Sequence, residues 1–153
     1  FVTVMIHECF EKATAVSASG ESPIATLELD YLHRSRSRGR AIDSEGDDIA
    51  WFLARGGVIA DEDVLVSKQG KWIKILAAKE EVSDVHASPE ALIHAAYHLG
   101  NRHLPLQIGH GWLRYQKDHV IDEMIRSFGL TVAHVDAPFD PEVGAYHGGH
   151  RHD

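Results

Sequence analysis

The chain has 153 residues, of which 44% are hydrophobic and 25% charged, a composition that fits one ordinary globular domain or two small ones. Its formal net charge of -8 argues against nucleic acid as a partner, because phosphate binding requires a basic face. A single cysteine, Cys9, excludes both an intrachain disulfide and a thiolate metal cage. With no membrane-spanning apolar run and no signal-peptide pattern, we expect a cytoplasmic protein without a membrane partner.

The first half of the chain predicts a small all-β domain over residues 1–76. Residues 25–31 alternate apolar and polar side chains, the pattern of a half-buried strand. After a turn over 44–48, residues 49–53 predict an apolar strand, and residues 64–76 predict a hairpin. Nothing in this half resembles a catalytic constellation.

Four arginines recur at every second position in this half: Arg34, Arg36, Arg38 and Arg40. On a strand all four guanidinium groups would face one side. One interpretation is a docking patch for an acidic partner. The other is a solvated edge strand that resists aggregation, because the acidic residues of 43–48 are close enough in sequence to pair with it.

The second half predicts a ferredoxin-like βαββαβ domain over residues 77–140, so the whole chain is of the α+β class. Ser88 is a good helix N-cap followed by Pro89, and Asp118 caps a second helix. Beyond residue 140 the glycines, histidines and lack of periodicity predict a flexible tail over 141–153. The expected elements are strand 81–86, helix 88–99, strands 106–108 and 112–115, helix 118–129 and strand 130–135.

The helical periodicity predicts which faces are buried and where the helices stop. Gly100 is expected to take the left-handed conformation that ends the first helix, and Gly129 to close the second. The expected buried residues are Leu92, Ile93, Ala96 and Leu99 on the first helix, and Val120, Ile121, Met124, Ile125 and Phe128 on the second.

Twelve histidines are several times the usual share, and without cysteine they point to nickel, zinc or copper. His103 lies at a polar corner between helix and strand, where a metal or a second subunit could reach it. One imidazole cannot hold a divalent ion, so it needs partners from elsewhere in the fold, from the tail or from another copy. The tail histidines His147, His150 and His152 follow or flank glycines that would let them close over a metal.

Other histidines are weaker candidates for a peripheral metal site. His119 lies in the first turn of the second helix, and His110 lies between two glycines at a hairpin turn. His94 and His98 have the four-residue spacing of a helical chelate, but they are expected on the solvent side of their helix.

The corner also carries a resemblance to a known family. Tyr97-His98-Leu99-Gly100-Asn101-Arg102-His103, followed by Pro105-Leu106-Gln107-Ile108, resembles the signature of the urease accessory protein E (UreE) family of nickel metallochaperones. The resemblance covers the second half and, more weakly, the first. Further matching pieces are Leu113-Arg114-Tyr115, Asp118-His119-Val120, Phe128-Gly129-Leu130, Pro138-Phe139 and Gly144-Ala145-Tyr146.

The resemblance implies that His103 lies at a symmetric dimer interface, where two copies share one metal and C-terminal histidines complete the coordination. It implies Ni²⁺ as the metal, with Zn²⁺ or Cu²⁺ also binding in vitro, and a homodimer that could pair into a tetramer with metal. The implied partners are apo-urease and the urease accessory GTPase. The family's N-terminal domain is regarded as a peptide-binding module, which favours a docking role for the arginines.

Two rival functions stay open at this stage. A zinc-dependent hydrolase could use His103 with His119 and a carboxylate, Asp122 or Glu123. A peptide-binding assembly factor could act without metal. Some relatives also carry histidines at both positions matching Lys117 and His119, and a protonated lysine weakens or abolishes that peripheral site. The preferred reading is a nickel chaperone that catalyses no reaction.

Overall fold

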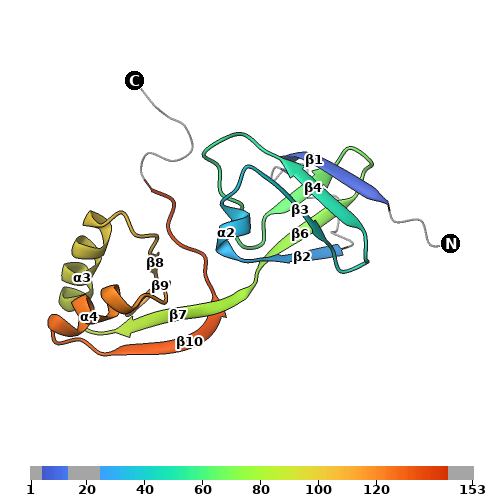
Figure 1. The fold of residues 1–153 in the computed structure, drawn as a ribbon. Coiled ribbons are helices and arrows are strands. Elements are labelled where there is room, and N and C mark those ends of the chain that lie inside the picture. The colour runs from blue at the N-terminus through green and yellow to red at the C-terminus, as the bar shows by residue number, and fades with distance from the viewer. Residues whose placement is uncertain (1–4, 14–24, 145–153) are drawn as a thin grey trace, which may run out of the picture. The chain divides into compact units, whose positions relative to one another are not determined.

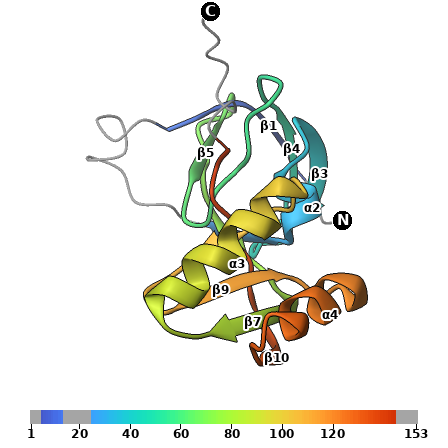
Figure 2. The same cartoon turned by 90° about the vertical axis from the view of Figure 1, so that its left-hand side faces the viewer.

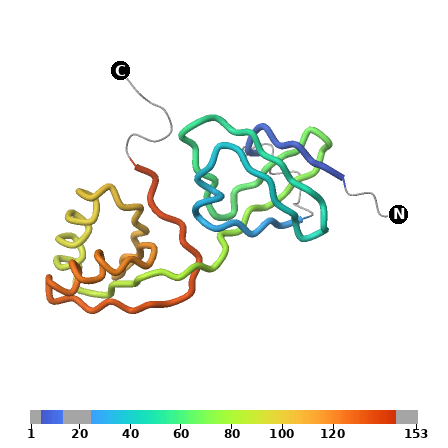
Figure 3. The backbone as a smooth tube through the Cα atoms, in the orientation of Figure 1, coloured from blue at the N-terminus to red at the C-terminus, as the bar shows by residue number. Residues whose placement is uncertain are grey.

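The computed structural model describes residues 5–13 and 25–144. The chain divides into two compact units, one ending at Ala77 and one formed by Ala78–Val143 (Figures 1 and 3). No helix within the described ranges combines the length and the apolar character that crossing a bilayer requires.

In the described residues, the N-terminal unit contains a six-stranded sheet and one short helix, which confirms the expected β-rich domain. The strand order is β2-β6-β5-β1-β4-β3, so β2 and β3 are its edges. Strand β1 pairs with β4, and β2 with β6, in parallel, and the other pairs are antiparallel. The elements are β1 (Ile6–Lys12), β2 (Ala25–Leu29), α2 (Tyr31–Arg34), β3 (Arg38–Ile42), β4 (Asp48–Phe52), β5 (Val64–Ser67) and β6 (Trp72–Ala77).

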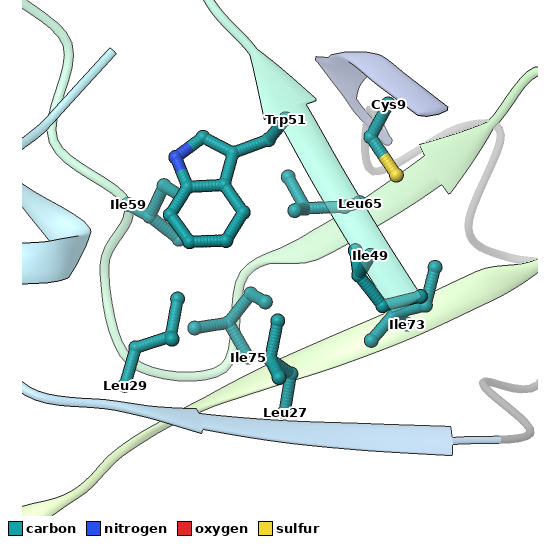
Figure 4. Packing of buried hydrophobic residues seen from close by; sticks show 9 residues of the cluster. All are labelled: Cys9, Leu27, Leu29, Ile49, Trp51, Ile59, Leu65, Ile73 and Ile75. Carbon is teal, nitrogen blue, oxygen red and sulfur yellow. The ribbon is translucent and has the colours of Figure 1, made fainter. Parts of the chain in front are cut away.

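Alternating side chains of these strands form the core of this unit (Figure 4). Trp51 is fully buried at its centre, and its indole N–H donates to the Arg36 carbonyl over 3.2 Å. Burial raises the pKa of the Cys9 thiol to about 11, which leaves it protonated and inert at neutral pH. The other members of the cluster are Leu27, Leu29, Ile49, Ile59, Leu65, Ile73 and Ile75.

Gly39 faces Trp51 in the register of β3 and β4, and it has no room for a side chain. A Cβ atom there would lie 2.1 Å from Cζ2 of the indole. Gly39→Ala is therefore expected to lower the free energy of unfolding by about 1–3 kcal/mol, through overpacking. Urea unfolding followed by tryptophan fluorescence measures this. Gly57→Ala, whose Cβ would meet only Ala54 O at 3.5 Å, is the matched control, and equal stability of both variants would contradict the packing argument.

The predicted arginine row differs from the structure at its first member. Arg34 lies in helix α2, which Asp30 caps by accepting the His33 N–H over 2.9 Å, and not in a strand. The Arg34 side chain is fully buried and donates to the carbonyls of Leu29 and Ile59, over 3.2 and 3.1 Å. The period-two spacing therefore spans a helix, a turn and a strand, and the prediction of four guanidinium groups on one strand face is wrong.

The C-terminal unit has the predicted ferredoxin-like order βαββαβ. Its sheet order is β10-β7-β9-β8, and all neighbouring strands are antiparallel. Figure 2 shows helices α3 and α4 beside these strands. The elements are β7 (Lys79–His86), α3 (Pro89–Asn101), β8 (Gln107–Ile108), β9 (Trp112–Gln116), α4 (His119–Ser127) and β10 (Val132–Pro138).

One apolar cluster joins both helices to this sheet, and it corrects part of the predicted helix faces. On α3 the inward residues are Leu92, Ala95 and Leu99, whereas Ile93 is 71% exposed. On α4, Val120 is also exposed. Ile93 and Val120 are each next in sequence to a buried residue, Leu92 and Ile121. Because a helix turns by about 100° per residue, their side chains lie outside the buried face.

Candidate metal centre

Helix α3 ends in a Schellman motif that positions His103. The Leu104 N–H donates to the Leu99 carbonyl over 3.4 Å, and the His103 N–H donates to the Gly100 carbonyl over 3.0 Å. These are the two bonds of that motif, with His103 at the position that glycine usually occupies. Leu99 and Leu104 both pack into the apolar cluster, which fixes the corner from the inside.

His103 has a φ of 56°, the left-handed region that side chains rarely adopt. The prediction that Gly100 would take this conformation is wrong: α3 continues through Asn101, and the left-handed residue comes three positions later. A strained non-glycine residue held by its surroundings is a common feature of functional sites. Here the strain presents an exposed imidazole at the corner of the domain.

His103 does not have a complete ligand set from its own surroundings. Within the described ranges, no group of three His, Cys or carboxylate ligand atoms includes it. The predicted ligands His147, His150 and His152 lie outside the described residues.

The chain that leads to these tail histidines passes the same corner. The Glu142 N–H donates to the Leu106 carbonyl over 2.8 Å, and the Asp140 N–H donates to the Gln107 side chain over 3.0 Å. Leu106 is only three residues from His103. His147 follows Glu142 by five residues, which cover up to about 17 Å in extended chain.

An apolar stripe on α3 leads to the His103 corner. Ile93 and Tyr97, four residues apart, are 71% and 66% exposed. Gly100 continues the stripe with open space around it. An isoleucine and a tyrosine exposed to this degree on one helix face, beside the candidate metal ligand, are typical of a surface that contacts another protein.

The peripheral candidates are not brought together among the described residues. His110 is exposed in the turn between β8 and β9, and His119 is exposed at the start of α4. Lys117 lies 3.6 Å from the Glu81 carboxylate. His94 and His98 contact the ring of Phe128, with centroids 4.9 and 5.1 Å away, so they are partly packed and not purely solvent-facing.

The C-terminal unit also contains a buried polar network around Asp122, which the sequence analysis does not predict. Asp122 Oδ1 accepts hydrogen bonds from Tyr115 Oη and Ser83 Oγ, over 2.6 and 2.8 Å, and Oδ2 lies 2.7 Å from His134 Nε2. Burial alone would raise the pKa of Asp122, but the hydrogen bonds from Tyr115, His134 and Ser83 outweigh it and lower that pKa. Burial and the bond to Asp122 raise the pKa of Tyr115.

This network removes the geometry that a zinc hydrolase would need. Asp122 is engaged by three side chains inside the unit, and Glu123 pairs with Arg126 over 2.8 Å. In the described part of the chain, neither carboxylate joins His103 and His119 in a ligand group. The only sequence signal for the network was Asp122 on the apolar side of its helix.

An acidic cluster in the N-terminal unit surrounds a lysine side chain at the place where a metal ion could bind. Among the described residues, Asp43, Glu45 and Asp47 form the one group whose ligand atoms converge. The buried Lys71 ammonium lies 2.6, 2.7 and 2.8 Å from these three carboxylates. Burial alone would lower the pKa of Lys71, but the bonds to the three carboxylates raise it, so the site carries its own cation.

The remaining arginines of the row are exposed. Arg38 and Arg40 lie on β3, and Arg36 lies two residues before its start. Arg40 pairs with Asp48 over 2.8 Å, whereas the guanidinium group of Arg38 stands over the ring of Phe52, 5.6 Å from its centroid. In the described ranges, Arg36 and Arg38 form no ion pair.

Comparison with known proteins identifies the class. The model of the UreE urease accessory protein N-terminal domain matches residues 6–78, and that of the C-terminal domain matches residues 80–153. The Urease accessory protein UreE of Teredinibacter turnerae is 52% identical over 121 residues, or 78% of this chain and 79% of its own. That of Saccharophagus degradans is 46% identical over 142 residues, or 92% and 84%.

These matches make the chain an accessory protein and not an enzyme. It belongs to the UreE urease accessory protein family, as the resemblance at Tyr97–His103 indicated.

Proposed function

We propose that this chain is a homodimeric nickel metallochaperone, which binds Ni²⁺ through His103 and delivers it for assembly of the urease active site. The observation that carries the proposal is the left-handed, exposed His103 at a fixed corner, without a ligand group of its own in the described residues. Membership of the UreE family supports the same role.

A two-fold axis near His103 supplies the missing ligand. A second copy would bring its own His103 to the same ion, and an isologous contact repeats every interaction twice. The exposed Ile93 and Tyr97 provide apolar area for such a contact. The tail histidines His147, His150 and His152 complete the coordination.

Imidazole ligation suits delivery better than storage. Neutral imidazoles exchange one at a time, so an ion can pass to a partner without the breaking of a thiolate cage. Such a site prefers copper to nickel by intrinsic affinity, so its selectivity comes from partners and from metal supply. The proposed partners are apo-urease and the urease accessory GTPase, in the cytoplasm.

A nickel titration by calorimetry, with the mass measured by light scattering, tests this proposal. We expect a tight site with half an ion per chain, on a dimer, that is lost in His103→Ala and retained in the control His110→Ala. The affinity is expected to fall steeply below a pH of about 6, because protonated imidazole cannot bind metal. A stoichiometry of one ion per chain on a monomer, with the same affinity in His103→Ala, would refute the shared site.

A further inference from the structure

Helix α3 carries two histidines whose rings are in contact, unlike the peripheral candidates His110 and His119. His94 and His98 lie four residues apart, on the same side of the helix. Their ring centroids are 4.6 Å apart, and the ring planes meet at 62°. His94 is exposed and His98 is half-buried, so the pair is accessible from solvent.

The separation of the two rings is the one that a chelate needs. A metal–nitrogen bond of about 2.1 Å places each imidazole centroid roughly 3.2 Å from the ion, so two rings at about 90–109° around one ion have centroids roughly 4.5–5.3 Å apart. The rings of His94 and His98 lie within that range. Chelation therefore requires at most a rotation of the two rings, and no change in the helix.

The ring of Phe128, which directly follows α4, packs against both imidazoles. Its centroid lies 4.9 Å from that of His94 and 5.1 Å from that of His98. Phe128 in turn packs against the apolar cluster of the C-terminal unit, so its position is fixed. Ligands whose side chains are restricted by packing lose less conformational entropy when they bind an ion.

The ring nitrogens of the pair are free to bind a ligand. Among the described residues, neither His94 nor His98 has a hydrogen bond or an ion pair. Other histidines do have such partners, as His134 does at Asp122 Oδ2 over 2.7 Å. Glu90, exposed one turn before His94 on the same side of α3, adds a negative charge next to the pair. These surroundings favour a cation as the ligand.

We propose that His94 and His98 together bind one divalent transition-metal ion per chain, as a second site besides His103, with water completing the coordination. Imidazole binds Ni²⁺, Zn²⁺ and Cu²⁺, whereas Mg²⁺ and Ca²⁺ prefer oxygen ligands. Both ligands come from a single helix, so the site needs no second subunit. Five residues separate His98 from His103, which is roughly 8 Å along a helix.

A calorimetric titration with nickel sulfate tests this site in a background that lacks the other proposed ligands. In that background His103, His147, His150 and His152 are all replaced by alanine. We expect it to bind one ion per chain, more weakly than the native chain binds at its tight site. The further change His94→Gln is expected to weaken this binding at least tenfold, because one imidazole cannot chelate. His98→Gln is expected to have the same effect.

His86→Gln in the same background is the matched control, since His86 is an exposed histidine at the end of β7 in the same unit. It is expected to bind nickel within twofold of the background. Thermal unfolding followed by far-UV circular dichroism gives a second measurement. An ion that links two turns of α3 binds only the folded helix, so about 1 mM nickel is expected to raise the Tm of the background by about 3 °C or more. The His94→Gln variant is expected to show no such shift.

The proposal is overturned if the background binds no nickel at about millimolar concentration, or if His94→Gln and His86→Gln reduce the affinity equally. Binding without a rise in Tm would place the ion away from the folded helix and would also contradict it. Because His103 is absent from every variant in this experiment, none of these outcomes bears on the shared site.

Discussion

Replacement of His103 by glycine is expected to abolish the tight nickel site and, at the same time, to stabilise the C-terminal unit. The left-handed conformation at φ 56° costs a side chain about 1 kcal/mol, and glycine adopts it freely. For a unit of this size, about 1 kcal/mol raises the Tm by roughly 4–8 °C. Loss of the imidazole is expected to weaken nickel binding by about 100-fold or more, or about 2.7 kcal/mol.

Thermal unfolding of the metal-free variants and nickel calorimetry measure the two effects separately. His110→Gly is the matched control, because His110 is also an exposed histidine in a turn but has no positive φ. It is expected to bind nickel like the native chain and to gain no stability. If His103→Gly unfolded below the native Tm, the strain assigned to this corner would be absent.

The second large effect is expected at Asp122, at the centre of the buried network. Asp122→Ala would remove the carboxylate that accepts the hydrogen bonds of the Ser83 and Tyr115 hydroxyls. Each buried unpaired donor costs about 1–3 kcal/mol, so the free energy of unfolding is expected to fall by about 3–5 kcal/mol. Urea unfolding followed by far-UV circular dichroism measures the loss. Glu123→Ala, at an exposed pair on the same helix, is expected to stay within about 1 kcal/mol of the native chain.

The same network predicts a dependence on pH. Hydrogen bonds lower the folded-state pKa of Asp122 below the unfolded value of about 3.9, so the ionised carboxylate favours the folded state above that value. This contribution disappears as the pH falls through the folded-state pKa. The stability difference between the native chain and Asp122→Asn is therefore expected to narrow between about pH 5 and pH 2. A constant difference over that range would show that the charge of Asp122 contributes nothing.

Much of the fold could be predicted because its signals are local. Ser88 and Asp118 accept hydrogen bonds from the first turns of α3 and α4 as N-caps, and Gly129 takes the expected positive φ after α4. The order of strands and helices then led to the ferredoxin-like sheet, since few topologies accommodate βαββαβ. The prediction was wrong at Arg34. Its two-residue spacing from the next arginine is typical of a strand, but Asp30 caps a helix that contains Arg34.

The candidate site could be located from the sequence but not described. His103 was marked by its motif and by the helix stop, yet the Schellman bonds at Leu99 and Gly100 depend on packing that no local pattern encodes. The Asp122 network joins residues from β7, β9, α4 and β10, up to 51 positions apart between Ser83 and His134. Hydrogen bonds between such distant positions follow from the tertiary fold, and composition cannot indicate them.

The lysine in the acidic cluster of the N-terminal unit has a consequence for the metal delivery that we propose. Asp43, Glu45 and Asp47 resemble a cation-binding loop, but their counter-ion is the side chain of Lys71, which is attached to the chain and cannot be removed by a chelator. These carboxylates therefore keep their counter-ion at high and at low concentrations of divalent ions. With metal exchanging at His103 as we propose, the folding of the N-terminal unit is expected not to depend on the supply of that metal.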